Sequence, residues 1–303
     1  MQKIKIGTRA SRLALWQAEF VAEELKKKYR ELEVELVKIH TTGDKILDSP
    51  LAKIGGKGLF TKDIEIKMAE GEINLAVHSL KDVPAELPPE FKIAAITKRE
   101  FYSDAFVSEK FSSLKSLPEN AIVGTSSLRR AAQISAIRPD LQIKNLRGNV
   151  ETRLKKLDAG EFDAIILAEA GLRRLGYSGR IKEILTEIIP AAGQGALALE
   201  IHSNDSATEE TINFLNDEKT AEEIKIEREF LKVIGGSCQV PVGIKASISN
   251  DFAEVDAIIS SPDGKNFIKD SFVERLENIK NFGEKIARQM LDRGGREILR
   301  ELI

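Results

Sequence analysis

Residues 3–17, KIKIGTRASRLALWQ, combine three features that decide the fold class. Isoleucines at alternate positions predict a strand, Gly7 and Thr8 predict a turn, and the apolar spacing that follows predicts an amphipathic helix. The same order returns in residues 121–133, AIVGTSSLRRAAQ, where a second Gly-Thr pair separates an apolar run from a helix start. The repeat predicts two similar α/β units.

Short apolar runs alternate with amphipathic runs along most of the chain. Strands are predicted over 34–41, 73–80, 91–97, 121–127, 141–147 and 162–168, and helices over 58–71, 128–138 and 149–159. This alternation favours mixed sheets covered by helices. After residue 235 the pattern changes to strand-like runs around a Ser-Pro-Asp-Gly turn at 261–264, followed by a helix. That pattern predicts a small α+β domain with an antiparallel sheet.

Hydroxyl and guanidinium groups follow both Gly-Thr turns. Arg9 and Ser11 follow the first turn, whereas Ser127, Arg129 and Arg130 follow the second. Helix N-termini and guanidinium groups both bind anions, so the repeat predicts paired anion sites that face a cleft. The alternative is that Ser11 and Ser127 only cap their helices.

Composition limits the class of protein. With 303 residues, 42% hydrophobic and 31% charged, the chain is typical of a soluble globular protein of two or three domains. A net charge of −2 gives no overall attraction to nucleic acid. We expect a cytoplasmic protein without a membrane span, because no run approaches ~18 apolar residues, the N-terminus lacks a secretory signal, and one cysteine suits a reducing compartment.

Charge is distributed unevenly. Residues 125–156 contain eight basic and two acidic side chains, whereas residues 205–230 contain nine acidic and three basic ones. The acidic stretch predicts a helix with a solvated face. The basic stretch places arginines at turns between strands and helices, where α/β proteins bind ligands. No metal site is predicted, since the three histidines lie apart from any cysteine or acidic cluster.

Two stretches have both an ordinary and a functional interpretation. Cys238, the only cysteine, lies in GGSCQVPVG at 235–243 and is either a small buried apolar side chain or a reactive thiol. Lys81 and Asp82 follow a predicted strand and form either an exposed ion pair or part of a site. Neighbours within a strand point to opposite faces, so both reach a ligand only if the strand ends before them.

Eight motifs occur in a particular order: GTRASRLALWQ, GGKGLF, AVHSLKDVP, IVGTSSLRRAAQ, NLRGNVETRLKKLD, DAIILAEAGLRRLG, PAAGQGALALE and GGSCQVPVG. Together they resemble the porphobilinogen deaminases, also called hydroxymethylbilane synthases. The resemblance covers residues 4–245 and is followed by a C-terminal domain. It implies a transferase of tetrapyrrole biosynthesis, of the haem and chlorophyll type. Such an enzyme condenses four porphobilinogen molecules, with loss of ammonia, into the linear tetrapyrrole hydroxymethylbilane.

The resemblance also implies a covalent dipyrromethane cofactor on Cys238, held by a thioether, that primes the growing chain. Asp82 resembles the catalytic carboxylate. Cofactor contacts are implied for Lys81, Thr125, Ser127, Arg129, Arg130 and Asn145. Contacts to porphobilinogen or the growing chain are implied for Arg9, Ser11, Arg147, Arg153, Arg174, Lys53, Lys57 and Phe60. Each pyrrole brings acetate and propionate groups, which basic side chains bind.

Three domains are implied by the same resemblance. They are domain 1 (1–97 with a return segment, 196–214), domain 2 (100–190) and domain 3 (217–303), which carries the cofactor cysteine. The expected fold is α/β, with two similar mixed-sheet domains of the two-lobed anion-binding type and a small C-terminal α+β domain with an antiparallel sheet. Three departures from the family pattern are Arg12, where proline is frequent, Asn145, where serine is expected, and the hinge segment 101–103.

The expected partners are porphobilinogen and, transiently, the ring-closing uroporphyrinogen-III synthase, and a monomer is expected. The alternative function is a two-lobed, non-catalytic binding or sensor module for a carboxylated small molecule. That alternative explains paired anion sites, but it explains neither Cys238 nor Asp82.

Overall fold

The computed structural model describes residues 3–41, 61–235 and 240–300. The chain forms two compact units, and each is described by itself. Of the described residues, the first unit contains 3–41, 61–100 and 195–222, and the second contains 101–194 and 223–300. The second unit thus includes most of the predicted domains 2 and 3. Their division into separate domains stays a prediction.

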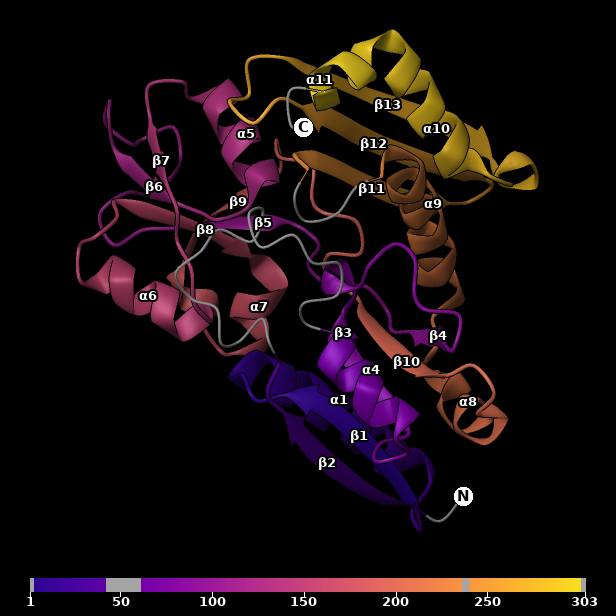
Figure 1. The fold of residues 1–303 in the computed structure, drawn as a ribbon. Helices are drawn as coiled ribbons and strands as arrows, with labels where there is room; N and C mark the ends of the chain where they lie inside the picture. Colours follow the sequence, from indigo (N-terminus) through magenta and orange to yellow (C-terminus); the bar gives the residue numbers. More distant parts are fainter. Residues whose placement is uncertain (1–2, 42–60, 236–239, 301–303) are drawn as a thin grey trace. The chain divides into compact units, whose positions relative to one another are not determined.

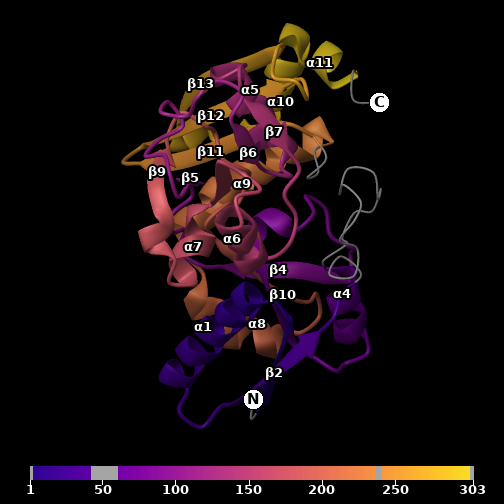
Figure 2. The same ribbon diagram turned by 90° about the vertical axis from the view of Figure 1, so that its left-hand side faces the viewer.

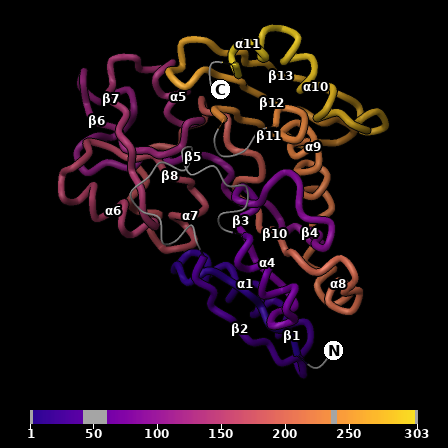
Figure 3. Tube along the Cα trace, viewed as in Figure 1, coloured from indigo at the N-terminus to yellow at the C-terminus, as the bar shows by residue number. Residues whose placement is uncertain are grey.

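The first unit is built on a mixed sheet in the order β2-β1-β3-β10-β4. Its strands are β1 (Lys3–Arg9), β2 (Glu33–Ile39), β3 (Leu75–Ser79), β4 (Phe91–Ile96) and β10 (Leu197–His202). β1 is parallel to β2 and β3, whereas β10 is antiparallel to β3 and β4. β10 returns to this sheet only after residues 101–194, a path that can be followed in Figure 3.

Helices cover both faces of this sheet. They are α1 (Arg12–Lys28), α4 (Lys62–Ala69), α8 (Ser206–Ile212) and the 3-10 helices η1 (Leu80–Asp82) and η3 (Asn213–Leu215). α1 and α8 pack on the face that carries Ile6 and Val77, and α4 packs on the opposite face with Ala76. This division follows from the alternation of side chains along each strand.

The second unit repeats this arrangement in a sheet of order β7-β6-β8-β5-β9. Its strands are β5 (Asp104–Val107), β6 (Ile122–Gly124), β7 (Gln142–Lys144), β8 (Ala164–Ala168) and β9 (Ile181–Leu185). β6 is parallel to β7 and β8, and β5 is antiparallel to β8 and β9. Two similar mixed sheets are therefore confirmed, although β5, β9 and β10 were not among the predicted strands.

Helices also cover both faces of the second sheet. They are α5 (Leu128–Ile137), α6 (Val150–Asp158), α7 (Glu169–Arg174) and the 3-10 helix η2 (Ser178–Arg180). Ile134 of α5 packs on one face with Val123, whereas Leu154 of α6 and Leu172 of α7 pack on the other with Ile165. Figure 1 shows α5 on one side of the sheet and α6 and α7 on the other.

The C-terminal part of the second unit is an antiparallel sheet of order β11-β12-β13, as predicted. It comprises β11 (Val242–Ser249), β12 (Phe252–Ser260), β13 (Phe267–Arg275), η4 (Leu276–Asn278), α10 (Phe282–Met290), the π-helical η5 (Leu291–Gly295), α11 (Arg296–Arg300) and α9 (Glu218–Ile234) from residue 223 onward. Figure 2 shows the three strands side by side. Phe230 of α9 and Ile286 of α10 join the core of this sheet.

The acidic helix α9 differs from its prediction. Its face is not wholly solvated, because Glu227 is fully buried. The carboxylate of Glu227 accepts hydrogen bonds from Gly193 N at 2.7 Å and from Ala246 N at 2.8 Å. Part of the negative charge of α9 therefore satisfies backbone donors. None of the helices in the described ranges combines the length and apolar character needed to cross a membrane.

Candidate functional site

In the first unit, four predicted site residues lie where two parallel strands end. Arg9 is the last residue of β1, Ser11 is the N-cap of α1, and Lys81 and Asp82 belong to η1. β1 and β3 are parallel neighbours, so their carboxyl ends meet at one edge of the sheet. The carboxyl edge is where open α/β sheets bind ligands.

The turn after β3 gives Lys81 and Asp82 different degrees of burial. β3 ends at Ser79, and Val83 N then donates to Leu80 O at 3.0 Å, which closes η1. Leu80 is buried, Lys81 is half-buried and Asp82 is exposed. The prediction that the strand ends before Lys81 and Asp82 is confirmed. An exposed carboxylate at this edge is accessible to a ligand.

The two predicted serines cap helices, as the alternative interpretation expected. Ser11 Oγ accepts a hydrogen bond from Ala14 N at 3.3 Å, and Ser127 Oγ accepts one from Arg130 N at 3.4 Å. These are long hydrogen bonds. Each uses an acceptor lone pair and leaves the hydroxyl hydrogen available as a donor. Capping is therefore compatible with anion binding, and that role of the serines stays a prediction.

In the second unit, predicted contacts follow the three parallel strands. Thr125 and Ser127 follow β6, Asn145 and Arg147 follow β7, Arg153 lies in α6, and Arg174 ends α7, the helix after β8. Arg153 Nε donates to Gly148 O at 2.8 Å, a contact that fixes its direction at the start of α6. The sequence-distant members of this set thus share the carboxyl edge of one sheet.

Arg129 and Arg130, in the first turn of α5, converge on one carboxylate. Arg129 Nη1 donates to Asp104 Oδ2 at 2.7 Å, and Arg130 Nε donates to Asp104 Oδ1 at 2.9 Å. Arg130 Nη2 lies 2.7 Å from the same Oδ1, and Gln194 Nε2 donates to it at 3.0 Å. The two arginines are 5% and 6% exposed, and Asp104 is fully buried. This cluster fixes both guanidinium groups in place.

Charge and burial shift the pKa values of the clustered side chains in opposite directions. Burial alone raises the pKa of Asp104, but the charges of Arg129 and Arg130 outweigh burial and hold that pKa well below its usual range. Burial lowers the pKa of Arg129, which the Asp104 carboxylate opposes. Two guanidinium groups and one carboxylate leave an excess of one positive charge. A carboxylate of a ligand would neutralise this excess.

Sequence reasoning missed Asp104 and Gln194. Asp104 opens the short strand DAFV, so the signal was a lone carboxylate at the start of an apolar run. Because buried carboxylates need partners, that position alone predicts an ion pair but not the identity of its cations. The partners come from residues 25 and 26 positions further along the chain. Only the fold brings them together.

Some predictions fall outside the described residues. These are Cys238, Lys53, Lys57 and Phe60. Across residues 3–41, 61–235 and 240–300, no group of three or more His, Cys, Asp or Glu side chains is arranged to hold a metal ion.

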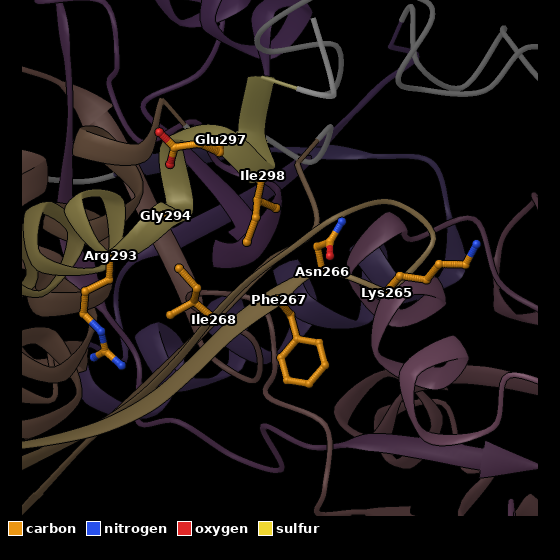
Figure 4. Close-up of a pocket in the computed structure, with 8 residues that line it drawn as sticks. All are labelled: Lys265, Asn266, Phe267, Ile268, Arg293, Gly294, Glu297 and Ile298. Atoms are coloured by element: carbon orange, nitrogen blue, oxygen red, sulfur yellow. The ribbon is translucent and has the colours of Figure 1, made fainter.

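A pocket of about 420 Å³ lies in the C-terminal part of the second unit, between the start of β13 and η5. Figure 4 shows its charged side chains, Lys265, Arg293 and Glu297, pointing in different directions rather than toward a common centre. None of the predicted site residues lines it. This pocket is therefore separate from the candidate site.

Two family models match the chain. The model described as porphobilinogen deaminase, dipyromethane cofactor binding domain, matches residues 4–210, and the model of the C-terminal domain matches residues 221–292. The chain belongs to the porphobilinogen deaminase family. This family consists of transferases, and dipyrromethane is its cofactor.

Curated relatives agree over nearly full length. The porphobilinogen deaminase of Campylobacter concisus is 49% identical over 304 residues, 99% of this chain and 98% of the relative. That of Campylobacter hominis is 50% identical over 304 residues, with the same coverage. That of Geobacter sulfurreducens is 48% identical over 304 residues, 100% of this chain and 95% of the relative. Among solved structures, the methionine-binding protein MetQ is 13% identical with a TM-score of 0.47, over 75% of this chain and 95% of that chain.

The second-unit site fits the cofactor of the porphobilinogen deaminase family. Each pyrrole of dipyrromethane carries acetate and propionate groups, so the site must bind several carboxylates. Arg129 and Arg130 supply the excess positive charge. Thr125 and Ser127, which follow β6, supply hydroxyl groups. Guanidinium and hydroxyl donors are the groups that bind carboxylates in proteins.

Proposed function

We propose that this chain condenses four porphobilinogen molecules into hydroxymethylbilane, with a dipyrromethane primer attached to Cys238. The match of both family models, over residues 4–210 and 221–292, carries the proposal. A non-catalytic binding module has no use for a lone thiol or for an exposed carboxylate at the end of a strand. The condensation uses both.

Each condensation forms one carbon–carbon bond. Porphobilinogen loses ammonia and becomes an azafulvene cation, the free α-carbon of the preceding pyrrole attacks its methylene carbon, and that α-carbon then loses its proton. When bound, dipyrromethane supplies the first such α-carbon. The thiolate of Cys238 is a soft nucleophile, which suits formation of a durable carbon–sulfur bond to an electrophilic methylene.

Asp82 has the catalytic role in this proposal. Positive charge develops on pyrrole nitrogens as ammonia leaves and the new bond forms. A carboxylate directed at the pyrrole N–H groups stabilises this charge more in the transition state than in the neutral ground state, and that difference raises the rate. The exposed Asp82 at the carboxyl edge of the first sheet supports the assignment. Lys81, its neighbour, binds a ring carboxylate.

The other predicted residues divide into two sets. Cofactor carboxylates are bound by Lys81, Thr125, Ser127, Arg129, Arg130 and Asn145. Substrate and the growing chain are bound by Arg9, Ser11, Arg147, Arg153, Arg174, Lys53, Lys57 and Phe60. The shared carboxyl edges of the parallel strands support a ligand-binding role for the members in the described ranges. Asn145 binds through its amide, which donates as a serine hydroxyl does.

The proposal extends to the setting of the enzyme. It acts as a cytoplasmic monomer and passes hydroxymethylbilane to the ring-closing uroporphyrinogen-III synthase through a transient contact. A single cysteine, reserved for the cofactor, supports a reducing compartment.

Intact mass under denaturing conditions tests the proposal. We expect the purified protein to exceed its 33.6 kDa chain by one dipyrromethane, and to react with an acidic aldehyde reagent for free pyrroles. Cys238→Ser should fold, keep the bare-chain mass and lose turnover, because a hydroxyl is a far weaker nucleophile than a thiolate. An active preparation with the bare-chain mass would exclude the covalent primer.

A further inference from the structure

The last two residues of β3 are held by polar contacts on opposite faces of the first sheet, one partly buried and one buried. On the α1 face, Gln17 Nε2 donates to Ser79 Oγ at 2.8 Å. On the α4 face, His78 Nε2 lies 2.8 Å from Glu200 Oε2. β3 ends at Ser79 and η1, which carries Asp82, begins at the next residue. The strand end next to Asp82 is thus fixed from both sides.

The His78–Glu200 contact crosses two neighbouring strands. In the antiparallel pair of β3 and β10, His78 lies opposite Ala198 and Ala76 lies opposite Glu200. His78 and Glu200 are therefore diagonal neighbours on one face, within reach of long side chains. Their side chains are 5% and 0% exposed. A carboxylate in such surroundings is costly unless its oxygens have partners.

One oxygen of Glu200 has no hydrogen-bond partner among the described residues. This oxygen, Oε1, is buried, whereas Oε2 faces His78. Glu65, on α4, is a second buried carboxyl group over the same sheet face. Burial raises the pKa of Glu65, and the negative charge of Glu200 raises it further.

We propose that His78 and Glu200 form a positioning network that fixes the end of β3 and, through it, the direction of the Asp82 carboxylate. The inference rests on the proposed catalytic role of Asp82. His78 and Glu200 do not touch the substrate, and act through the backbone between His78 and Asp82. Leu80 N donates to Ala196 O at 3.1 Å, so β10 holds the backbone on both sides of Ser79.

Stability alone does not account for this choice of residues. Apolar side chains of similar volume replace many buried polar pairs without loss of stability, whereas removal of one partner leaves an uncompensated charge. The double variant His78→Leu/Glu200→Met therefore separates positioning from stability. We expect it to keep a melting temperature close to the parent and a full cofactor mass. Its kcat should fall by about 10- to 100-fold with KM unchanged, since misplacement by about 1 Å costs up to ~10²-fold.

A matched pair of single variants gives an independent readout. The amide of His78→Gln reaches the position of Nε2, whereas the shorter amide of His78→Asn does not. We expect His78→Gln to retain most of the parent kcat and His78→Asn to lose about 10-fold or more. Equal kcat values for the two variants, or parent kcat in a stable double variant, would overturn the network. Asn74→Leu is the control, because Asn74 Oδ1 accepts from Lys5 N at 3.0 Å next to the opposite end of β3. It should reduce stability without changing kcat.

Asp82→Asn, measured in parallel, separates failure of the network from failure of the proposed function. If Asp82→Asn loses turnover while the double variant keeps the parent kcat, the positioning network is overturned and the catalytic role of Asp82 stands. Normal turnover by Asp82→Asn overturns the catalytic role of Asp82 and with it the purpose of the network.

Discussion

Asp104 organises two cations that would otherwise repel each other. Its two oxygens bind Arg129 and Arg130, so both guanidinium planes are fixed before a ligand arrives. Backbone carbonyls add to this, since Arg129 donates to Ile189 O at 2.8 Å and Arg130 to Ile166 O at 3.2 Å. Pre-organised donors lose less entropy on binding than mobile ones. The first-turn arginines of α5 are thus directed by a residue on β5.

Replacement of Asp104 by Asn should destabilise the protein by about 3–5 kcal/mol, because two buried guanidinium groups lose their counter-charge. Chemical denaturation at neutral pH measures this. The lowered pKa of Asp104 means that its stabilisation is present above its ordinary pKa of 3.8 and is lost as pH falls through the lowered value. Asp140→Asn is the control, since it removes a partly exposed pair with Arg138. If the two variants had equal free energies of unfolding, the buried cluster would stabilise the protein no more than the pair of Arg138 and Asp140 does.

Glu65 should give the opposite pH dependence. Its raised pKa means that the parent is most stable, with respect to this group, below the ordinary value of 4.5. That contribution is lost as pH rises through the raised pKa. Glu65→Gln should therefore melt close to the parent at pH 4 and above it at pH 8. Glu72→Gln is a control of opposite sign, because Lys67 lowers the pKa of Glu72 and its contribution is lost as pH falls. If the difference in melting temperature between Glu65→Gln and the parent were the same at pH 4 and pH 8, the raised pKa of Glu65 would be contradicted.

Sequence periodicity predicted the elements that repeat and missed those that depend on distant pairing. β1 and β6 carry the Gly-Thr signal, and α1 and α5 follow with clear amphipathic spacing. β5 and β9 are short, and β10 joins a sheet whose other strands end at residue 96. The pattern of a six-residue strand such as LALEIH, which includes a glutamate and a histidine, does not identify the strand that it pairs with. The partner is fixed by the whole topology.

The candidate site was predictable to the same extent. Arg9, Ser11 and Ser127 follow the two Gly-Thr pairs, so the local pattern placed them near strand ends. The turn predicted at Gly7 and Thr8 was wrong, because both residues lie inside β1. His78 and Glu200 were not predictable as a pair, because 122 residues separate them and neither belongs to a local cluster. Charged residues inside apolar runs were the available signal. Such residues predict a buried partner, but only strand register identifies it.

The glycine of the turn at residues 261–264 lies close to the backbone of α5. Gly264 has φ of +73°, and a Cβ added there would lie 2.1 Å from Ala132 O of α5. Gly71 has φ of +72° with no atom within 4 Å of an added Cβ. Gly71→Ala should cost about 1–2 kcal/mol for its left-handed backbone alone. Gly264→Ala should cost about 1–3 kcal/mol more, because the turn must also move away from α5. Equal costs in denaturant unfolding would show that this packing is loose.

On the scale of the whole molecule, net charge conceals the organisation of the site. The chain has 46 basic and 48 acidic side chains, yet the basic ones predicted to bind ligand end or follow the parallel strands wherever the structure describes them. Acidic side chains are used elsewhere, as with Glu227, which satisfies backbone donors. A polyanionic product therefore requires local rather than global positive charge.

The two sets of arginines should separate cofactor attachment from turnover. Arg130→Leu removes a guanidinium group from the pair with Asp104 and from the proposed cofactor contacts, each charge-assisted hydrogen bond contributing ~1.5–3 kcal/mol. We expect mostly bare-chain mass and a lower melting temperature than the holo form, since a ligand bound only to the folded state stabilises it. Arg129→Leu should behave in the same way. Full cofactor mass and parent turnover in both variants would make these arginines structural only.

Arg147→Leu and Asp82→Asn should give the reverse pattern. Arg147 follows β7 and is assigned to substrate, so its loss should leave the cofactor mass intact and impair elongation.

Asp82→Asn keeps the side-chain volume and a hydrogen-bond acceptor but removes the charge that opposes the azafulvene cation. Turnover should fall by on the order of 10²-fold or more, as it does when one preorganised stabilising group is lost. Asp82→Glu should retain more activity than Asp82→Asn, because it keeps the charge. Intact protein mass and turnover are measured on the same samples. If Asp82→Asn carried the full cofactor mass and kept near-parent turnover, Asp82 would be an exposed surface carboxylate without a catalytic role.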